Sequence, residues 1–377
     1  MDKKTTNIIF GVVAFAIIAY ILVTFIGGGS SKVFYTPAIE ALDTQKADVK
    51  DSILNTNALG QKLVNATGDE SFVISPYLVA NSLGVYALGS MEEGHDEVAG
   101  ILGIEENIKE NLAGLNDSIE ERLGQNSKTV KTLIVDKSVK PTDEFLEVVK
   151  YSGTYFASYD FKDFADVKKQ VNEYANKQTV GKISNLVKEI YPNTQFMFVS
   201  GIDFNAKFEN VFDDAKVNEG ILSVSKAKAY YYKDNNGTYV RIPLDNGMSY
   251  EVFMPESMGD LSLAEMNEYR AKAKFTIIGL TMPDTKIESY ADLNDALMNL
   301  EVKAPFENKK LIKPLTTSAQ LVLDGVEQNV SISIEAQGQN AGISESVTAN
   351  VNINKPYFYA VTDTHNNNSR VILGKHF

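Results

Sequence analysis

The chain contains no cysteine, no tryptophan and only three histidines among its 377 residues. Without cysteine it can form no disulfide, no thiolate nucleophile and no cysteine-based zinc or iron–sulfur site. The histidines, His95, His365 and His376, are far apart in the sequence and lack the short spacing of metal ligands. The sequence therefore predicts no metal site and no cofactor, and a fold that packing and hydrogen bonds alone stabilise.

Basic residues are in deficit, because 36 lysines and arginines stand against 49 acidic residues and give a formal net charge of -13. A protein that binds nucleic acid through the phosphates needs a basic face, since counterion release supplies much of the affinity. We therefore expect no nucleic-acid partner. The length is sufficient for one large domain or for two of medium size.

The pattern of a hydrolase is missing as well. No G-x-S-x-G turn occurs, and His376 is the penultimate residue. Adjacent acids such as Glu92 and Glu93 are typical of a solvated surface, because neighbouring residues of a helix do not face each other. We expect that the protein is not an enzyme.

One long apolar run lies near the N-terminus. Residues 7–26 contain no charged residue and follow Lys3 and Lys4. A helix of this length, at about 1.5 Å per residue, matches the roughly 30 Å of hydrocarbon in a bilayer. The positive-inside rule then places the lysines in the cytoplasm and the rest of the chain outside. The alternative is a cleaved signal peptide, although its apolar stretch is usually shorter, at about 7 to 15 residues.

We accordingly expect a cytoplasmic N-terminus (1–6), a transmembrane signal-anchor (7–26), a glycine-rich tether (27–45) and one ectodomain (46–377). This organisation predicts a single-pass membrane protein whose bulk lies on the extracytoplasmic side, at the surface of a cell or a virion. Five glycosylation sequons make the ectodomain a glycoprotein candidate, although a chain so rich in asparagine contains a few by chance.

Helical spacing of apolar residues predicts helices over residues 46–64, 75–88 and 166–190. In the second of these, we expect Ser75 to cap the helix and Pro76 to occupy its first turn. Predicted strands follow later, over residues 196–199, 239–242, 250–254, 275–278, 330–334, 351–353, 357–361 and 371–373. Because helices come first and strands later, we expect an α+β fold with a large central sheet, mixed or antiparallel, and flanking helices.

Seven segments of the chain resemble segments of the serpin superfamily, in the same order and at similar spacing. They lie within residues 71–104, 171–183, 198–212, 240–255, 280–306, 354–358 and 372–375. The resemblance implies a serpin fold from about residue 50 to the C-terminus. The positions that match the structural motifs of the family are Ser75, Pro76, Asn172, Thr179, Gly181, Phe204, Phe208, Pro243, Pro283, Pro356, Phe358 and Gly374.

Serpins are protease inhibitors in which an exposed reactive loop is cut, inserts into the central sheet and traps the protease covalently. The resemblance places the hinge of this loop at Glu335, Gly338, Gln339, Asn340, Ala341 and Gly342. Gln339 replaces the usual threonine, and Asn340 replaces the usual glutamate. The reactive-loop candidates that follow are Ile343, Ser344, Glu345, Ser346, Val347, Thr348, Ala349 and Asn350.

Two features of this loop argue against insertion. Glu345 brings a charge where an inserting strand prefers a small side chain, and a charge in a packed interior is costly unless its position faces solvent, which the alternation of side chains along a strand leaves open. The chain also takes only 18 steps from Gly338 to Pro356. We count this as about seven fewer than inhibitory serpins have, which removes on the order of 20 Å of reach at about 3.3 Å per residue.

By the same count, the residue that a protease would recognise falls near Asn352, inside a predicted strand. We therefore predict a membrane-anchored, non-inhibitory serpin-like protein that binds another protein or serves as a structural component of a surface. The alternative is a serine protease inhibitor that works by loop insertion, with a protease as its partner.

Overall fold

The computed structural model describes residues 31–37, 48–104, 106–124, 126–191, 193–209, 212–307, 310–313, 315–317, 320–336 and 342–377. The predicted signal-anchor at residues 7–26 and most of the predicted tether lie outside these ranges. Within them, no helix combines the length and the apolar character needed to cross a bilayer.

Most of the helical residues come from the first half of the chain, as predicted. The helices there are α2 (Val49–Ala66), α3 (Pro76–Gly89), α4 (Glu92–Leu102), α5 (Ile108–Leu123), α6 (Asp143–Ser152) and α7 (Phe164–Gln178), with a single 3-10 turn at Phe161–Asp163. Three shorter helices follow: α8 (Leu263–Lys272), α9 (Asn294–Asn299) and α10 (Ala304–Glu307). Almost every residue of α3 is buried, as its lack of a polar face requires.

The helix predicted over residues 166–190 is wrong in its second half, because α7 ends at Gln178. Val180 and Gly181 have φ angles of +53° and +83°. These angles belong to the left-handed region, which interrupts a right-handed helix. The apolar residues at helical spacing beyond this break are nevertheless buried, so their pattern indicated burial and not helix: Ile183, Leu186, Val187 and Ile190.

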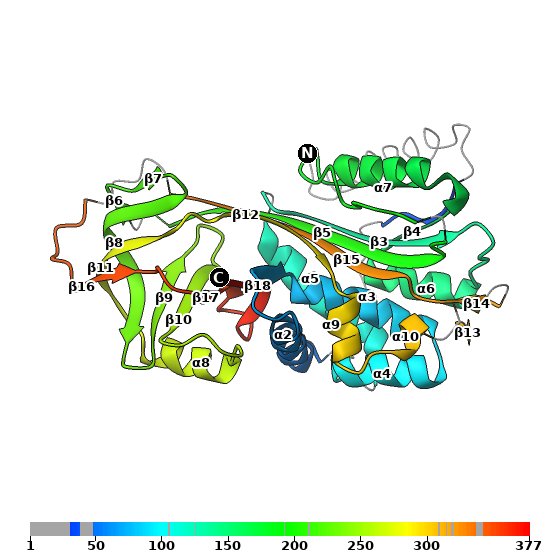
Figure 1. Ribbon diagram of the computed structural model, residues 1–377, viewed down its shortest axis with the longest axis horizontal. Coiled ribbons are helices and arrows are strands. Elements are labelled where there is room, and N and C mark those ends of the chain that lie inside the picture. The colour runs from blue at the N-terminus through cyan, green and yellow to red at the C-terminus, as the bar shows by residue number, and fades with distance from the viewer. Residues whose placement is uncertain are drawn as a thin grey trace, which may run out of the picture.

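The first large sheet has six strands and carries the helices on both faces (Figure 1). Its order is β1 (Lys32–Tyr35), β4 (Tyr155–Tyr159), β3 (Lys128–Asp136), β5 (Phe196–Lys207), β15 (Gly325–Glu335) and β12 (Lys286–Asp292). Helix α7 covers one face, and α3, α5 and α6 lie on the other. Strands β5 and β15 run parallel, as do β3 and β4.

The second sheet forms the other half of the molecule. Its main path is β16 (Ala349–Asn352), β11 (Lys274–Pro283), β8 (Ile221–Lys233), β9 (Gly237–Pro243), β10 (Ser249–Pro255), β17 (Tyr357–Asp363), β18 (Ser369–His376) and β2 (Phe72–Ile74). Two short strands, β6 (Phe212–Asp213) and β7 (Lys216–Asn218), also pair with β8, and β13 (Lys310–Leu311) pairs with β14 (Gln320–Leu321). The predicted strands are confirmed, but the single central sheet is replaced by two, and β3 and β4 of the first half were missed.

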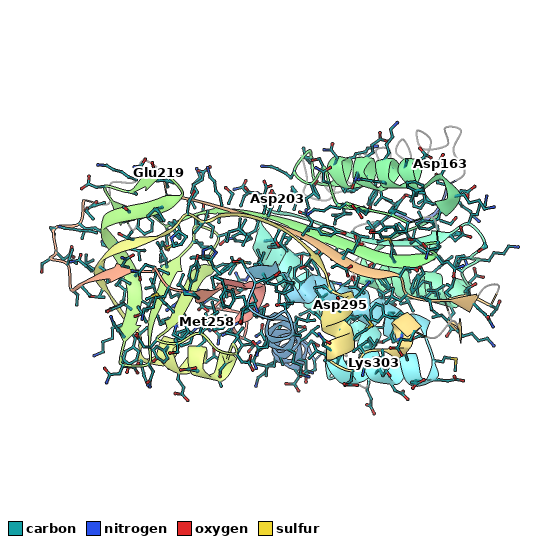
Figure 2. The ribbon with its side chains drawn as sticks, in the orientation of Figure 1. Asp163, Asp203, Glu219, Met258, Asp295 and Lys303 are labelled. Atoms are coloured by element: carbon teal, nitrogen blue, oxygen red, sulfur yellow. The ribbon has the colours of Figure 1, made fainter. Side chains whose placement is uncertain are left out.

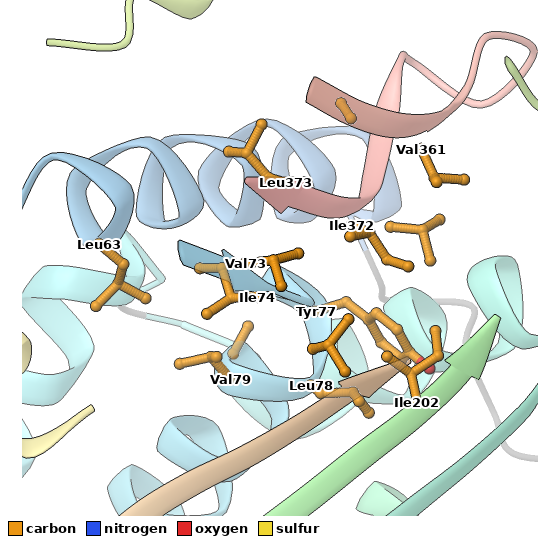
Figure 3. Packing of buried hydrophobic residues seen from close by; sticks show 14 of the residues in the cluster. Leu63, Val73, Ile74, Tyr77, Leu78, Val79, Ile202, Val361, Ile372 and Leu373 are labelled. Carbon is orange, nitrogen blue, oxygen red and sulfur yellow. The ribbon is translucent and has the colours of Figure 1, made fainter. Parts of the chain in front are cut away.

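The main core lies where the two sheets and helix α3 meet (Figure 3). Its labelled side chains come from α2, β2, α3, β5, β17 and β18, which are distant in sequence. Leu63, Ile74, Tyr77, Leu78 and Leu373 are fully buried there. Contacts of this kind join segments that are distant in the sequence into one buried cluster.

Ser75 acts differently from its predicted role as a cap, because its hydroxyl makes no hydrogen bond to the first turn of α3. Instead it donates to the Val371 carbonyl of β18 at 2.7 Å. The side chain of Gln328 on β15 accepts from the Ser75 amide at 2.6 Å and donates to the Ser75 carbonyl at 3.2 Å. All these groups are buried. Through them, Ser75 connects the start of α3 by hydrogen bonds to β15 of the first sheet and to β18 of the second.

Candidate functional site

The region that the sequence marked as a reactive loop connects the two sheets. Strand β15 ends at Glu335 in the interior of the six-stranded sheet, and β16 begins at Ala349 on the edge of the other sheet. The connection is therefore residues 336–348, which is 13 residues. The C-terminal part of this connection lies at the left end of the molecule in Figure 1, beside β11 and β16. Figure 2 marks that end by Glu219 in the β7–β8 turn and the opposite end by Asp163 before α7.

The hinge begins on a paired strand. Glu335 forms an ion pair of 3.2 Å with Lys207, the residue opposite it on β5, and its carbonyl accepts the Phe208 amide at 3.1 Å. Ala336 is buried. The predicted hinge residues Gly338, Gln339, Asn340 and Ala341 lie outside the described residues.

Gly342, the last hinge residue, and Ile343, the first loop residue, are hydrogen-bonded to β6 and β8 of the second sheet. The Asp213 carboxylate on β6 accepts the amides of Gly342 and Ile343, at 2.9 and 2.8 Å. Lys226 on β8 donates to the Ile343 carbonyl at 2.6 Å, and the Ile343 side chain is only 5% exposed. We call Asp213, Lys226, Gly342 and Ile343 the latch. Sequence reasoning missed it, although Ile343 is the one large aliphatic residue between positions 337 and 346.

Ser344, Glu345 and Ser346 form the longest continuous exposed stretch among the described residues of the loop. Gly342 and Thr348 are exposed as well, and Val347 is half-buried. Thr348 shares a hydrogen bond of 2.7 Å with the Thr276 hydroxyl, and its amide donates to the Ile277 carbonyl at 2.8 Å. The chain is thus held on both sides of this exposed stretch.

The last two loop candidates, Ala349 and Asn350, belong to strand β16 and pair with Ile278 and Gly279 of β11. The fit there is tight, because a side chain at Gly279 would place its Cβ 2.4 Å from the Asn350 amide oxygen. Asn352, where counting places the residue that a protease would recognise, is the last residue of the same strand. The prediction that this position lies inside a sheet is confirmed.

The place where a serpin loop would insert is closed. Strands β5 and β15 are neighbours over eleven register pairs, from Met197 opposite Gly325 to Lys207 opposite Glu335. Gln328 strengthens this contact, because it bonds Ser75 on one side and approaches the Ser200 hydroxyl of β5 at 3.4 Å on the other. An inserting strand must break the backbone pairing and this side-chain bridge together.

A half-buried acid, Glu327, lies in the same strand. Desolvation, together with the nearby acids Asp292 and Glu189, raises the pKa of Glu327 from an ordinary value of 4.5 to about 7. The Tyr290 hydroxyl of β12 donates to the Glu327 carboxyl and opposes this rise. The Lys188 ammonium lies 4.4 Å from the centre of the Tyr290 ring. Glu327 is therefore half protonated close to neutral pH.

Among the family-motif residues, Asn172, Thr179 and Gly181 organise the chain after α7. The Asn172 side chain donates to the Val187 carbonyl at 3.0 Å and accepts the Val187 amide at 2.9 Å. The Thr179 hydroxyl donates to the Ala175 carbonyl at 2.7 Å and accepts the Ile183 amide at 2.9 Å. These bonds replace the helical hydrogen bonds that end when Gly181 turns the chain.

The other motif residues have packing roles. Phe204, Phe208 and Phe358 are fully buried, and a Cβ at Gly374 would lie 2.6 Å from the Tyr359 ring. Three prolines mark strand ends: Pro243 ends β9, Pro283 ends β11, and Pro356 precedes β17. Pro76 begins α3 as predicted. Within the described residues no group of acids and histidines could hold a metal ion.

Comparison with known proteins agrees with this architecture. The family model described as Serpin (serine protease inhibitor) matches residues 55–377. The human protein alpha-1-antichymotrypsin is 25% identical over 355 residues, covering 82% of this chain and 83% of its own. Alaserpin of Manduca sexta is 24% identical, covering 84% of this chain and 91% of its own. Among solved structures, mouse protein-Z dependent protease inhibitor has a TM-score of 0.75 at 17% identity, over 87% of this chain and 97% of that one.

We predict that the latch controls access to the loop. The Asp213→Ala variant loses the acceptor of two loop amides, so limited proteolysis within residues 342–348 should be at least about fivefold faster, as expected for loss of two charge-assisted hydrogen bonds. The melting temperature should hardly change, because Asp213 is only partly buried and the hydrogen bonds that are lost lead to the loop and not to the core. The matched control is Asp214→Ala, whose carboxylate bonds Ser225 instead. Equal cleavage rates in the two variants would contradict the latch.

We also predict a pH dependence of stability from Glu327. Because its pKa is raised from 4.5 to about 7 in the folded state, the folded protein holds a proton that the unfolded chain has already released in this window. The free energy of unfolding should therefore fall as pH rises from 4.5 to 7, and level off above. The Glu327→Gln variant should lose this slope and gain about 1–3 kcal/mol at pH 8 in urea unfolding. Exposed Glu288→Gln is the control, and an unchanged slope in Glu327→Gln would refute the assignment.

Proposed function

Because the chain belongs to the serpin family, we propose that it is a membrane-anchored serpin whose loop does not inhibit proteases and whose folded domain acts through protein contacts at a surface. The inhibitory mechanism needs a loop that is long, free and able to become a new sheet strand. The connection between β15 and β16 supports none of these properties. This connection is the observation that carries the proposal.

Length is the first argument. A loop cut after Ser346 would free residues 337–346, which extend about 33 Å at roughly 3.3 Å per residue. Strand β15, along which they would have to lie, has eleven residues. By the same rule β15 spans about 36 Å, so the cut end would stop at least one residue short of the far end of β15, and any residue used to reverse the chain direction adds to this shortfall. A protease bound to the cut end would therefore not be carried past the end of the sheet.

Attachment is the second argument. The latch holds the loop at Gly342 and Ile343, and the Thr348 bonds hold it just before β16. A protease needs several consecutive residues in extended form, whereas the exposed residues between these two attachments are Ser344, Glu345 and Ser346. Insertion would further bring Glu345 into the sheet, with the desolvation cost of a buried charge.

The membrane anchor rests on the sequence. Residues 7–26 are long and apolar enough to span a bilayer. Strand β1 begins at Lys32, so only residues 27–31 separate the folded domain from the predicted span. Five residues extend at most about 18 Å, so the domain would lie close to the lipid surface with its six-stranded sheet nearest to the anchor.

One observation favours the alternative, a serine protease inhibitor like those after which the relatives are named. The parallel pair of β5 and β15 is the neighbour arrangement into which an antiparallel strand can insert and hydrogen-bond on both sides. The slot for insertion is therefore retained even though the connection is short. The discriminating measurement is what happens when the loop is cut.

We predict that cutting the loop does not stabilise the protein. Limited proteolysis between residues 344 and 348 should leave the melting temperature within a few degrees of the intact value, because no new strand forms. No SDS-resistant complex should appear with the serine or cysteine proteases tested. The matched variant carries seven extra residues of Gly, Ala and Thr between Ser346 and Val347.

If length is what prevents insertion, the lengthened chain should gain thermal stability on cleavage while the native chain does not. A rise of tens of degrees in the cleaved native chain, or a covalent protease adduct, would establish the inhibitor instead.

We predict for topology that the anchor is retained. Protease treatment of intact cells or particles should release peptides from residues 50–377, and detergent should be needed to recover the intact chain. Mass spectrometry of the N-terminus provides the check. A mature N-terminus near Ser30 in the membrane-free fraction would replace the anchored protein with a secreted one and leave the loop argument untouched.

A further inference from the structure

Strand β1 closes one edge of the six-stranded sheet. Lys32, Val33 and Tyr35 pair antiparallel with Ser158, Ala157 and Phe156 of β4. In Figure 1, β1 is the dark blue strand beside β4, below α7. Without β1, the backbone of β4 would be the free edge of this sheet, because the other neighbour of β4 is β3.

The strand also contributes packing on both faces of the sheet. Val33 packs against the buried cluster under α7 that includes Ala157. Phe34 packs on the opposite side, with its ring 4.9 Å from that of Phe156. Both faces of a four-residue strand thus meet complementary apolar surface, which makes its docking specific in register.

The two edges of the sheet differ in chemistry. Strand β12 at the far edge contains Lys286, Glu288 and Asp292, and charges on an edge strand discourage pairing with another chain. Strand β4 contains no charged residue, no proline and no glycine, and all five of its residues are buried. An uncharged strand of this kind, once uncovered, is a template for strand addition.

We propose that the β4 edge is a strand-acceptor surface which β1 normally occupies within the same chain, and which takes β1 of a second copy when its own β1 is withdrawn. The second copy is the fitting occupant, because its residues 32–35 carry the same backbone register and the same Val33 and Phe34 contacts. Exchange of an identical element between copies creates no new interface chemistry and so costs little. The proposal does not depend on whether the loop inhibits proteases.

The position of β1 in the chain makes such withdrawal feasible. It is the first described element of the chain and is separated from α2 by residues 36–48, so α2 is not part of the segment that leaves. A strand of four residues provides few contacts, and exchange in dilute solution should be rare. Copies held in one membrane by the proposed anchor would meet at a much higher effective concentration, which favours the exchanged form.

The absence of native cysteine allows a direct test with disulfides in the whole 377-residue chain. Val33→Cys with Ala157→Cys, and Lys32→Cys with Ser158→Cys, each join residues directly opposite in the register. Adjacent pairs alternate between wide and close spacing, so one of the two should form a disulfide within the chain. Lys32→Cys with Ala157→Cys is the mismatched control, because neighbouring residues of a strand point to opposite faces.

Exchange is measured with two differently tagged chains, mixed at high concentration in mild detergent. One carries Val33→Cys and supplies the strand, and the other carries Ala157→Cys and supplies the edge. Adding Phe34→Ser to the second chain weakens its own β1, and the disulfide between chains should then increase severalfold. Adding Phe34→Ser to the first chain as well should return it to the starting level.

Two results would overturn the proposal. One is an unchanged yield between chains when Phe34→Ser is on the acceptor, while circular dichroism shows that this chain is folded. The other is equal cross-linking by the mismatched Lys32→Cys donor, which would indicate random collision. Retention of the anchor does not enter either result, so failure here is distinct from failure of the proposed topology.

Discussion

The covalent connection between β15 and β16 limits what this end of the molecule can do. One end is fixed by the eleven register pairs that join β15 to β5, and the other by the pairing of β16 with β11. Between these fixed points the chain has 13 residues. The latch and the Thr348 bonds attach the described part of this connection to the second sheet on both sides of residues 344–347.

The sheet itself resists opening for a related reason. Gln328 reaches from β15 to the backbone of Ser75 at the start of α3, and Ser75 in turn bonds the Val371 carbonyl of β18. Moving β15 away from β5 would leave these buried amide and carbonyl groups without partners, each at a cost of about 1–3 kcal/mol. The tie between sheet and helix therefore stabilises the closed arrangement independently of the loop.

The sequence predicted the parts of the fold that local pattern encodes. Helix α2 and several of the later strands were found because burial repeats at their own period, and Ser75 and Pro76 marked the start of α3. The order of the motifs indicated the family, but β8 and β12 were not predicted. What it missed depends on distant partners. The second half of the helix predicted over residues 166–190 is overridden at Val180 and Gly181. Strands β3 and β4 are almost continuously buried and lack alternation. The Ser75 hydroxyl bonds the Val371 carbonyl, almost 300 residues away in the sequence, and no local pattern predicts this contact.

The latch and strand β1 have one physical feature in common, because each supplies hydrogen-bond partners to backbone groups elsewhere in the chain. Backbone groups that would be unpaired in a loop or on a sheet edge are paired here by the chain's own residues: Asp213 and Lys226 for the loop, and Lys32 to Tyr35 for β4. A serpin that traps proteases must keep its loop unpaired in order to release strain when it is cut. In this chain Gly342, Ile343 and Thr348 already make hydrogen bonds to the body of the intact protein, and on the function proposed above these bonds reduce what cutting the loop could gain.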